Sequence, residues 1–364
     1  MPSDRVGPGP VVLAVAAFYA AFSVGALALH GWDPLWFVWI GERYSVGDPH
    51  GRTGYDGQFI YYLARDGWAA LPHLDNAAYR LQRILYPLLV RALTGGAPAR
   101  IPWAMVAINA ASILATTFLV TGWLIGQGVW RWWGLVYPLF VGTFMAYSRD
   151  LTEPLACALA AVGVLAWLGD RRAAALILFA LGAIARETIA LFPVGIALAE
   201  LCRGRWSHAA LLALAVAPAL AWQFYLTATI GLPIAPAARL NIIPAAGMFT
   251  AMSLEPGRLS SLLFIGLPVI VLTPLAGRDL LRAPGNPIGW LVVLHCAMLL
   301  VSSAQTNLHL MACGRVAVPL VLALLFGFPH IAPARRAAIA VIAILPTFVW
   351  IAPVLWWAPW TAKL

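Results

Sequence analysis

Apolar residues along the chain gather in eleven runs, each bounded by arginine, proline or glycine. A helix of about twenty apolar residues is long enough to cross the hydrocarbon core of a bilayer. The pattern therefore predicts an all-α, polytopic membrane protein with about eleven transmembrane helices. The predicted spans are 11–30, 101–125, 133–148, 151–168, 173–185, 189–200, 207–230, 259–277, 286–303, 314–330 and 336–357.

Composition indicates that lipid is the solvent. Hydrophobic residues make up 62% of the 364 positions and charged residues 10%, whereas soluble domains carry about 25% charged residues. So few charges cannot cover the surface of a soluble protein of this length. The net charge is +9, but the arginines stand singly or in pairs between apolar runs. This spacing is typical of membrane-flanking anchors and gives no reason to expect nucleic acid as a partner.

The apolar stretch 173–200 is interrupted by Arg186-Glu187. As one span it would leave two charges in lipid, at a cost of several kcal/mol. Arginines at 171–172 and at 203 and 205 flank the stretch, so both of its ends belong on one side of the membrane. We therefore expect two short helices, 173–185 and 189–200, that meet at Arg186-Glu187 in a turn below full bilayer height.

The distribution of charges predicts one orientation. With the N-terminus in the cytoplasm, ten of the fourteen carboxylates lie on the outer side, and the short arginine-rich turns all lie inside. These turns carry Arg131, Arg171, Arg172, Arg203, Arg205, Arg278, Arg282, Arg335 and Arg336. We expect a multi-pass protein of the inner (cytoplasmic) membrane, with its first span retained and its site facing the periplasm or exterior.

Two segments on the outer side are long. Residues 31–100 form the first outer loop, in which Tyr79–Leu93 places arginines among apolar residues and predicts an amphipathic helix in the outer interface. Residues 231–258, with three prolines before position 245, form the second. Residues 101–364 form the helix bundle, and with no internal repeat or soluble domain we expect a single membrane domain over 1–364.

The densest polar cluster lies in the first outer loop, at Gly54-Tyr-Asp-Gly-Gln-Phe-Ile-Tyr-Tyr-Leu-Ala-Arg-Asp-Gly67. Glycines near Asp56 permit a tight backbone beside a ligand. The helical phase of the next residues places Asp56 and Gln58 at a helix N-terminus, which favours a phosphate. A carboxylate there stays ionised and can accept a proton from an attacking hydroxyl. The alternative interpretation is that Asp56 only caps the helix.

A first outer loop that carries an Asp and an aromatic-rich helix resembles the GT-C glycosyltransferases, which use polyprenyl-phosphate sugars. Tyr55-Asp56-Gly57-Gln58-Phe59, with Leu63-Ala64 and Gly67, is similar to the Trp-Asp…Phe…Ile-Ala…Gly-Tyr pattern of the GPI mannosyltransferase branch. Together with Tyr79-Arg80-Leu81-Gln82-Arg83, it resembles more closely bacterial multi-span proteins linked to cell-surface glycopolymers, which carry Tyr-Asp-Gly-Gln and then Tyr-Arg-x-x-Arg. The motifs cover the first hundred residues, and the remainder is similar only in span pattern.

The resemblance implies roles for these residues. In GT-C enzymes the essential acid often follows the first span directly, which is the place of Asp33; we prefer Asp56 as the catalytic base, and the choice stays open. A donor phosphate needs cations as its glycosidic bond breaks, and the candidates are Arg80, Arg83 and Arg186. The alternatives are interfacial anchoring for the first two and a structural ion pair for Arg186-Glu187. The candidate substrate-binding residues are Tyr55, Gln58, Tyr62, Glu187, His309 and Arg315.

Other polar features predict less. Arg149-Asp150-Leu-Thr-Glu153 reads as a tight turn followed by an ordinary helix N-cap region. The histidines match no zinc spacing, the four cysteines have no CxxC spacing, and no nucleotide-binding motif is present. We therefore expect neither a metal nor a cofactor.

The leading hypothesis is an inverting membrane glycosyltransferase that moves a sugar from a polyprenyl-phosphate donor to a lipid or glycan acceptor at the cell surface. Its partners would be the donor, the acceptor and membrane lipids. The alternative is a transporter or flippase for a lipid-linked saccharide; such proteins usually carry repeated halves and polar residues at the membrane midplane. A third hypothesis is a non-catalytic partner in glycan export.

Overall fold

The computed structural model describes residues 7–230 and 240–356. Within these residues there is no β-strand, only an isolated bridge between Leu240 and Ser302. Six helices are long and apolar enough to cross a membrane. The prediction of an all-α membrane protein is therefore confirmed, whereas the other five of the eleven predicted spans and the GT-C-like fold stay predictions.

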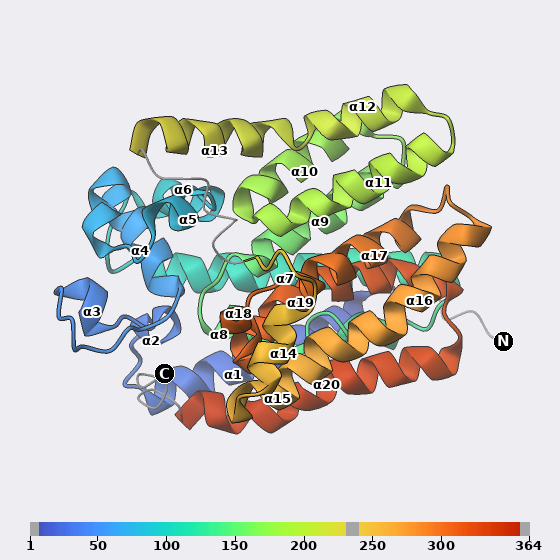
Figure 1. Ribbon diagram of the computed structural model, residues 1–364. Helices are drawn as coiled ribbons and strands as arrows, with labels where there is room; N and C mark the ends of the chain where they lie inside the picture. Colours follow the sequence, from blue (N-terminus) through green and yellow to red (C-terminus); the bar gives the residue numbers. More distant parts are fainter. Residues whose placement is uncertain (1–6, 231–239, 357–364) are drawn as a thin grey trace.

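The long helices lie side by side along one axis (Figure 1). Some of them are continuous pairs of elements, and one contains a π-helical turn. They are α1 (Gly9–Leu29), α7 (Ile101–Gly126), α12 (Trp206–Leu214) with α13 (Ala217–Ile230), α15 (Glu255–Ser261) with η5 (Leu262–Gly266) and α16 (Leu267–Arg282), α19 (Leu310–Gly327) with η6 (Phe328–His330), and α20 (Pro333–Trp356).

Shorter helices complete the bundle. They are η2 (Arg131–Leu135), α8 (Val141–Ser148), α9 (Glu153–Leu168), α10 (Arg172–Ala185), η3 (Glu187–Ala190), α11 (Leu191–Cys202) and α17 (Pro287–Leu300). The helix pair predicted over 173–200 is present, because α10 ends at Ala185 and α11 begins at Leu191, with Arg186 in extended conformation between them.

The run 133–148 does not form one helix. Residues 136–140 lie outside both η2 and α8, and Pro138 has no N–H with which to continue a helix. Two carbonyl groups in this break accept hydrogen bonds from side chains of other helices. The Tyr19 hydroxyl of α1 donates to Pro138 O at 2.6 Å, and the Thr347 hydroxyl of α20 donates to Leu139 O at 2.7 Å. Irregular backbone is tolerated inside a membrane protein when its polar groups are satisfied in this way.

Short helices gather at the left-hand end of the bundle in Figure 1. From the first outer loop come α2 (Leu35–Val38), α3 (Glu42–Ser45), α4 (Gly57–Asp66), η1 (Gly67–His73), α5 (Ala77–Leu81) and α6 (Leu85–Thr94). From later segments come α14 (Ala246–Met252) and α18 (Ala304–Asn307). The second predicted outer loop thus contains α14 and the start of α15, while its residues 231–239 lie outside the described chain.

The single amphipathic helix predicted over Tyr79–Leu93 is wrong, because Gln82–Ile84 separates α5 from α6. Hydrogen bonds from α13 stabilise this break. The Trp222 indole donates to Leu81 O at 2.8 Å, and the Gln223 amide donates to the side chain of Gln82. Arg83 lies in this break, and its side chain contacts both Tyr79 of α5 and the distant Glu187.

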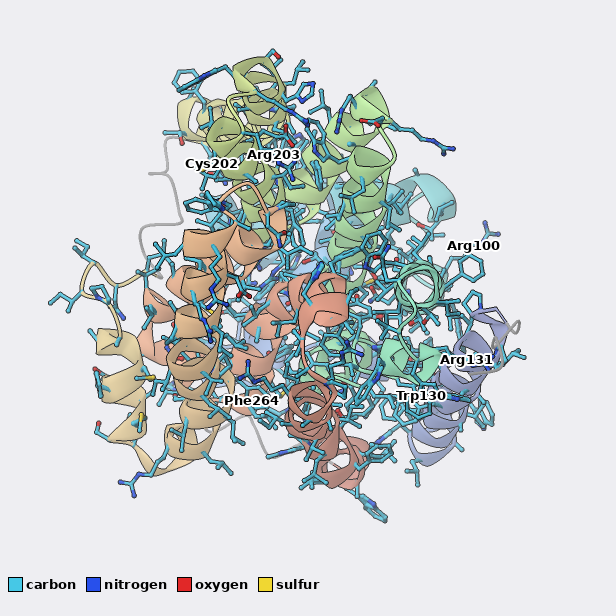
Figure 2. All side chains as sticks on the ribbon, turned by 90° about the vertical axis from the view of Figure 1, so that its right-hand side faces the viewer. Arg100, Trp130, Arg131, Cys202, Arg203 and Phe264 are labelled. Carbon is cyan, nitrogen blue, oxygen red and sulfur yellow. The ribbon has the colours of Figure 1, made fainter. Side chains whose placement is uncertain are left out.

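Helix α19 forms the centre of the bundle. Over its most apolar stretch 83% of the residues are buried, against 17% for the peripheral α20. Viewed from the right-hand end of Figure 1, the helices are packed around one another with side chains filling the space between them (Figure 2). Closest contact is with α8, where a Cβ added to Gly142 would lie 2.1 Å from Gly314 O. This contact fixes the part of α19 that carries Arg315.

Gly142→Ala is expected to lower the unfolding temperature of the purified protein, because its methyl group would force α8 away from α19. Overpacking of this kind costs about 1–3 kcal/mol. Thermal unfolding in detergent measures the effect. The control is Gly122→Ala on α7, where an added Cβ meets nothing within 4 Å and alanine favours the helix. Equal unfolding temperatures for both variants would contradict the close approach.

Candidate functional site

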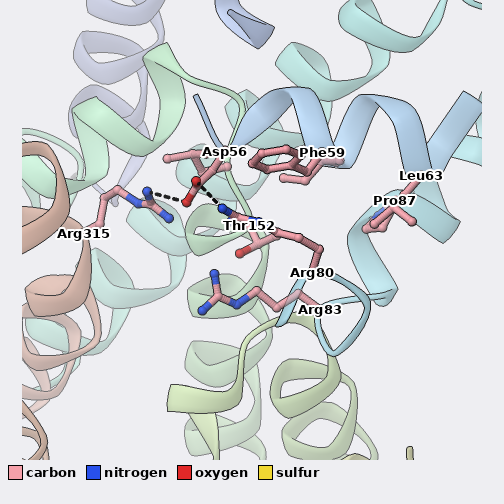
Figure 3. A pocket seen from close by; sticks show the side chains of 10 residues that line it. Asp56, Phe59, Leu63, Arg80, Arg83, Pro87, Thr152 and Arg315 are labelled. Atoms are coloured by element: carbon pink, nitrogen blue, oxygen red, sulfur yellow. Dashed lines mark hydrogen bonds and ion pairs between the residues drawn. The ribbon is translucent and has the colours of Figure 1, made fainter. Parts of the chain in front are cut away.

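Asp56 lies between two arginines that come from distant parts of the chain (Figure 3). Arg80 of α5 donates through Nη2 to Asp56 Oδ1 at 2.9 Å, and Arg315 of α19 donates through Nη1 to Oδ2 at 3.0 Å. Asp56 immediately precedes α4, as predicted, but its side chain makes no capping hydrogen bond. The interpretation of Asp56 as a simple helix cap is therefore wrong.

Two further ion pairs, Arg80–Asp75 and Arg83–Glu187, extend this cluster. Arg80 also donates to Asp75, through Nε at 2.7 Å and Nη2 at 2.8 Å. Arg83 donates to Glu187, through Nε at 2.9 Å and Nη2 at 2.6 Å, and also to the Tyr79 hydroxyl at 2.7 Å. The guanidinium planes of Arg80 and Arg83 are thereby fixed by paired bonds, the geometry that recognises carboxylates and phosphates.

A third pairing lies deeper, around Glu153 at the start of α9. Its side chain is fully buried; Oε1 accepts from Arg315 Nε at 2.6 Å and lies 2.9 Å from Arg186 Nη1. Nη1 and Nε of Arg186 have no hydrogen-bond partner in the described chain. Arg186 contacts Glu153 and is not among the residues that line the pocket at Asp56. Arg186 is thus an ion-pair residue, but its partner is Glu153 and not the predicted Glu187, which pairs with Arg83.

The cluster as a whole is electrically balanced. Its four arginines (Arg80, Arg83, Arg186 and Arg315) face four carboxylates (Asp56, Asp75, Glu153 and Glu187). Burial by itself raises the pKa of Asp56, but the charges of Arg80 and Arg315 outweigh burial and hold that pKa well below its usual range. Burial likewise raises the pKa of Glu187, but the charge of Arg83 lowers it by more, and the resulting pKa is about 2. Both carboxylates are ionised at neutral pH.

The pocket at this cluster is lined by charged and apolar side chains. The polar ones are Asp56, Arg80, Arg83, Thr152 and Arg315, and the apolar ones are Phe59, Ile60, Leu63, Pro87 and Leu151. The two kinds are in contact, since the ring centre of Phe59 lies 4.2 Å from the guanidinium carbon of Arg80. Figure 3 shows Arg83 directed into the space below Asp56, with Leu63 and Pro87 on the far side. The free volume is about 20 Å³, room for about one water molecule, so a larger anion that reaches these arginines has to displace side chains that line the pocket.

Several predicted site residues lie elsewhere. Asp33 is exposed in a different pocket, where its carboxylate accepts from Leu35 N at 2.9 Å. Gln58 is buried, with its amide bonded to Gly41 N and Thr53 O, so its role is to hold the loop against α4. The ring of Tyr62 stacks on His73 with centroids 4.6 Å apart. His309 immediately precedes α19 and is not among the residues that line the pocket at Asp56.

Other predicted residues belong to the cluster. Tyr55 stacks on Trp39 and accepts from Arg315 Nη1 at 3.0 Å, and Glu187 binds Arg83 as described. Sequence reasoning missed Glu153 and Asp75. Glu153 was assigned to an ordinary helix start, although four polar residues between two apolar runs were a signal for a buried network. Within the described residues no group of three or more His, Cys, Asp or Glu side chains is placed to hold a metal ion.

Glu153→Gln is expected to destabilise the protein strongly, because it leaves Arg186 and Arg315 without the charge that balances them. Removing one partner of a buried ion pair costs about 3–5 kcal/mol. Thermal unfolding in detergent measures the loss. The matched control is Glu42→Gln at the solvent-exposed Glu42–Arg52 pair, which should leave the unfolding temperature unchanged. A similar result for the two variants would show that Glu153 does not hold the cluster together.

Comparison with known proteins does not identify a function for this site. No protein-family model matches the sequence, and no curated protein and no solved structure matches the chain. The function is therefore argued from the site itself.

Proposed function

We propose that this protein is a membrane glycosyltransferase that moves a sugar from a polyprenyl-phosphate donor to a cell-surface acceptor on the outer face of the membrane. One observation carries the proposal: a carboxylate held between two guanidinium groups lies in a pocket that is lined by apolar side chains as well. A lipid-linked sugar combines the matching groups, with a phosphodiester between a polar ring and a prenyl chain. The carboxylate supplies a base, and the arginines supply ligands for phosphate.

The proposed reaction is a direct displacement with inversion. The acceptor hydroxyl oxygen attacks the anomeric carbon and forms the new glycosidic bond, while the bond from that carbon to the phosphate oxygen breaks. The electron pair of the broken bond leaves with the polyprenyl phosphate, and the hydroxyl proton passes to Asp56. Negative charge grows on the departing phosphate, so Arg80 and Arg83 bind the transition state more tightly than the bound donor.

Donor binding also changes Asp56 in this scheme. The ligand-free carboxylate is a weak base, because each of its oxygens accepts a bond from a guanidinium group, and a general base works best with a pKa near the working pH. When a donor phosphate accepts hydrogen bonds from Arg80, the hydrogen bond from Arg80 to Asp56 is weakened, and the pKa of Asp56 rises. The donor therefore prepares the base before the acceptor reacts.

The proposed placement in the membrane has eleven spans and a cytoplasmic N-terminus. In support, the turns that join α11 to α12 and α16 to α17 lie at the right-hand end in Figure 1, and the short helices around Asp56 lie at the opposite end. Arg203 and Arg205 belong to the first of these turns, and Arg278 and Arg282 lie at the end of α16. Arginine-rich turns favour the cytoplasmic side, which leaves the pocket facing the periplasm or exterior.

Asp56→Asn is expected to reduce transfer by about 100- to 10,000-fold, the usual contribution of a general base. Membranes that contain the protein are incubated with a panel of labelled polyprenyl-phosphate sugars and native acceptor extract. Asp48→Asn changes an exposed carboxylate of the same loop and should leave transfer unchanged.

Three outcomes would overturn parts of the proposal. Full activity of Asp56→Asn, with loss in Asp33→Asn, would make Asp33 the base. Movement of a lipid-linked saccharide across the membrane without sugar transfer would favour the transporter hypothesis. Normal glycan levels in cells with Asp56→Asn, and loss only when the whole protein is deleted, would indicate a non-catalytic assembly partner.

A further inference from the structure

A second cavity lies beside the cluster at Asp56. Its volume is about 410 Å³, within the range of about 300–1,000 Å³ that small-molecule sites occupy. Its walls combine aromatic rings with charged and polar groups. The residues that define it are His30, Asp33, Trp36, Trp39, Arg52 and Arg149.

Arg149 is the distinctive group of this cavity, because it is a buried cation that forms no ion pair with a described residue, although the charge of the adjacent Asp150 acts on it. Its side chain is 2% exposed, and its guanidinium carbon lies 4.6 Å from the ring centre of Trp36 and 4.7 Å from that of Trp39. Nη1 donates to Ser148 O at 2.7 Å, whereas Nε has no partner. Among the described residues no carboxylate pairs with it, in contrast to the four arginines of the first cluster.

An uncompensated buried charge is costly unless a partner neutralises it. The two indole rings hold the guanidinium in one orientation and shield it from water, so an incoming anion meets a group that is already positioned. Trp36 is fixed in turn by His30, whose ring stacks on it at 5.0 Å. The site is therefore built for an anionic ligand.

The two cavities share a wall. The turn from Arg149 to Thr152 contributes Arg149 to the second cavity and Thr152 to the first. Tyr55 stacks on Trp39 of the second cavity and bonds to Arg315 of the first. At Gly57, next to Asp56, an added Cβ would lie 2.4 Å from Arg149 O, so only glycine lets α4 press against this turn. A ligand held at Arg149 is thus a neighbour of Asp56.

We propose that this second cavity is the acceptor site and that it takes an acidic saccharide, a sugar ring bearing a carboxylate or a phosphate that pairs with Arg149. The inference rests on the proposed function, in which the neighbouring Asp56 takes the proton from a hydroxyl group of the acceptor. The aromatic walls and the volume accommodate a sugar ring, and His30, Asp33 and Arg52 at the cavity offer hydrogen bonds to its hydroxyl groups.

The test is direct binding of small probes to the full-length protein in detergent, without any transfer step. Saturation-transfer NMR compares methyl glucuronide with methyl glucoside, which differ only at the carboxylate, and adds glucose 1-phosphate as the phosphate-bearing sugar. The acidic sugars are expected to bind about tenfold to a hundredfold more tightly than the neutral one, the usual contribution of a hydrogen bond to a charged group. Whichever of the two acidic sugars binds with the higher affinity shows whether the site prefers a carboxylate or a phosphate.

Variants assign this preference to one residue. Arg149→Gln should abolish it, Arg149→Lys should keep part of it, and Arg205→Gln, at an exposed arginine outside the cavity, should leave it unchanged. Should Arg149→Gln fail to fold, the comparison of charged and neutral sugars on the wild type still decides the inference. Equal binding of both sugars, or displacement of the sugars by inorganic phosphate at the same concentration as glucose 1-phosphate, would overturn it.

The same measurements separate this inference from the proposed function. Preferential binding of acidic sugars that depends on Arg149, in a protein that transfers no sugar from any donor, would support the site and reject the enzyme. Sugar transfer that depends on Asp56, with no preference for acidic acceptors, would support the enzyme and reject the site.

Discussion

The paired bonds from Arg80 and Arg315 to Asp56 join the outer segment of the chain to the centre of the bundle. Arg80 belongs to the short helices of the first outer loop, and Arg315 belongs to the buried helix α19. In a site partly removed from water such bonds are strong, and each arginine is also held by a second carboxylate. Two further contacts support this one: Gly142 lets α8 approach α19 closely, and Arg83, between α5 and α6, is bonded to Glu187.

Buried guanidinium groups require counterions, and the two neighbouring cavities meet this requirement differently. In the cluster at Asp56 the protein supplies all the carboxylates, so an incoming phosphate must exchange with them, and the exchange changes the basicity of Asp56. At Arg149 the protein supplies two aromatic rings, and no carboxylate forms an ion pair with the guanidinium group within the described residues, so the proposed ligand would bring the paired charge. One site is therefore suited to a phosphate that arrives and departs, and the other to an anion that fixes the position of a hydroxyl group.

Long apolar runs were predictable because lipid demands about twenty apolar residues per helix, and Arg186-Glu187 revealed the turn between α10 and α11 for the same reason. The motif residues Asp56, Arg80 and Arg83 could also be singled out. The pairing among the charged groups could not be predicted, because Arg315 meets Asp56 and Glu153 only through packing of helices that are far apart in the chain. Gln58 shows the opposite error: its place in the motif indicated ligand contact, whereas buried backbone groups at Gly41 and Thr53 needed its amide.

The central claim is that the arginines around Asp56 bind the phosphate of a prenyl lipid. Binding of a short-chain polyprenyl phosphate to the purified full-length protein, compared with binding of the matching uncharged polyprenol, tests it most directly. The account predicts that the phosphate binds at least about tenfold more tightly and that Arg80→Gln removes most of this difference. Equal binding of the phosphate and the alcohol, or an undiminished preference in Arg80→Gln, would contradict it.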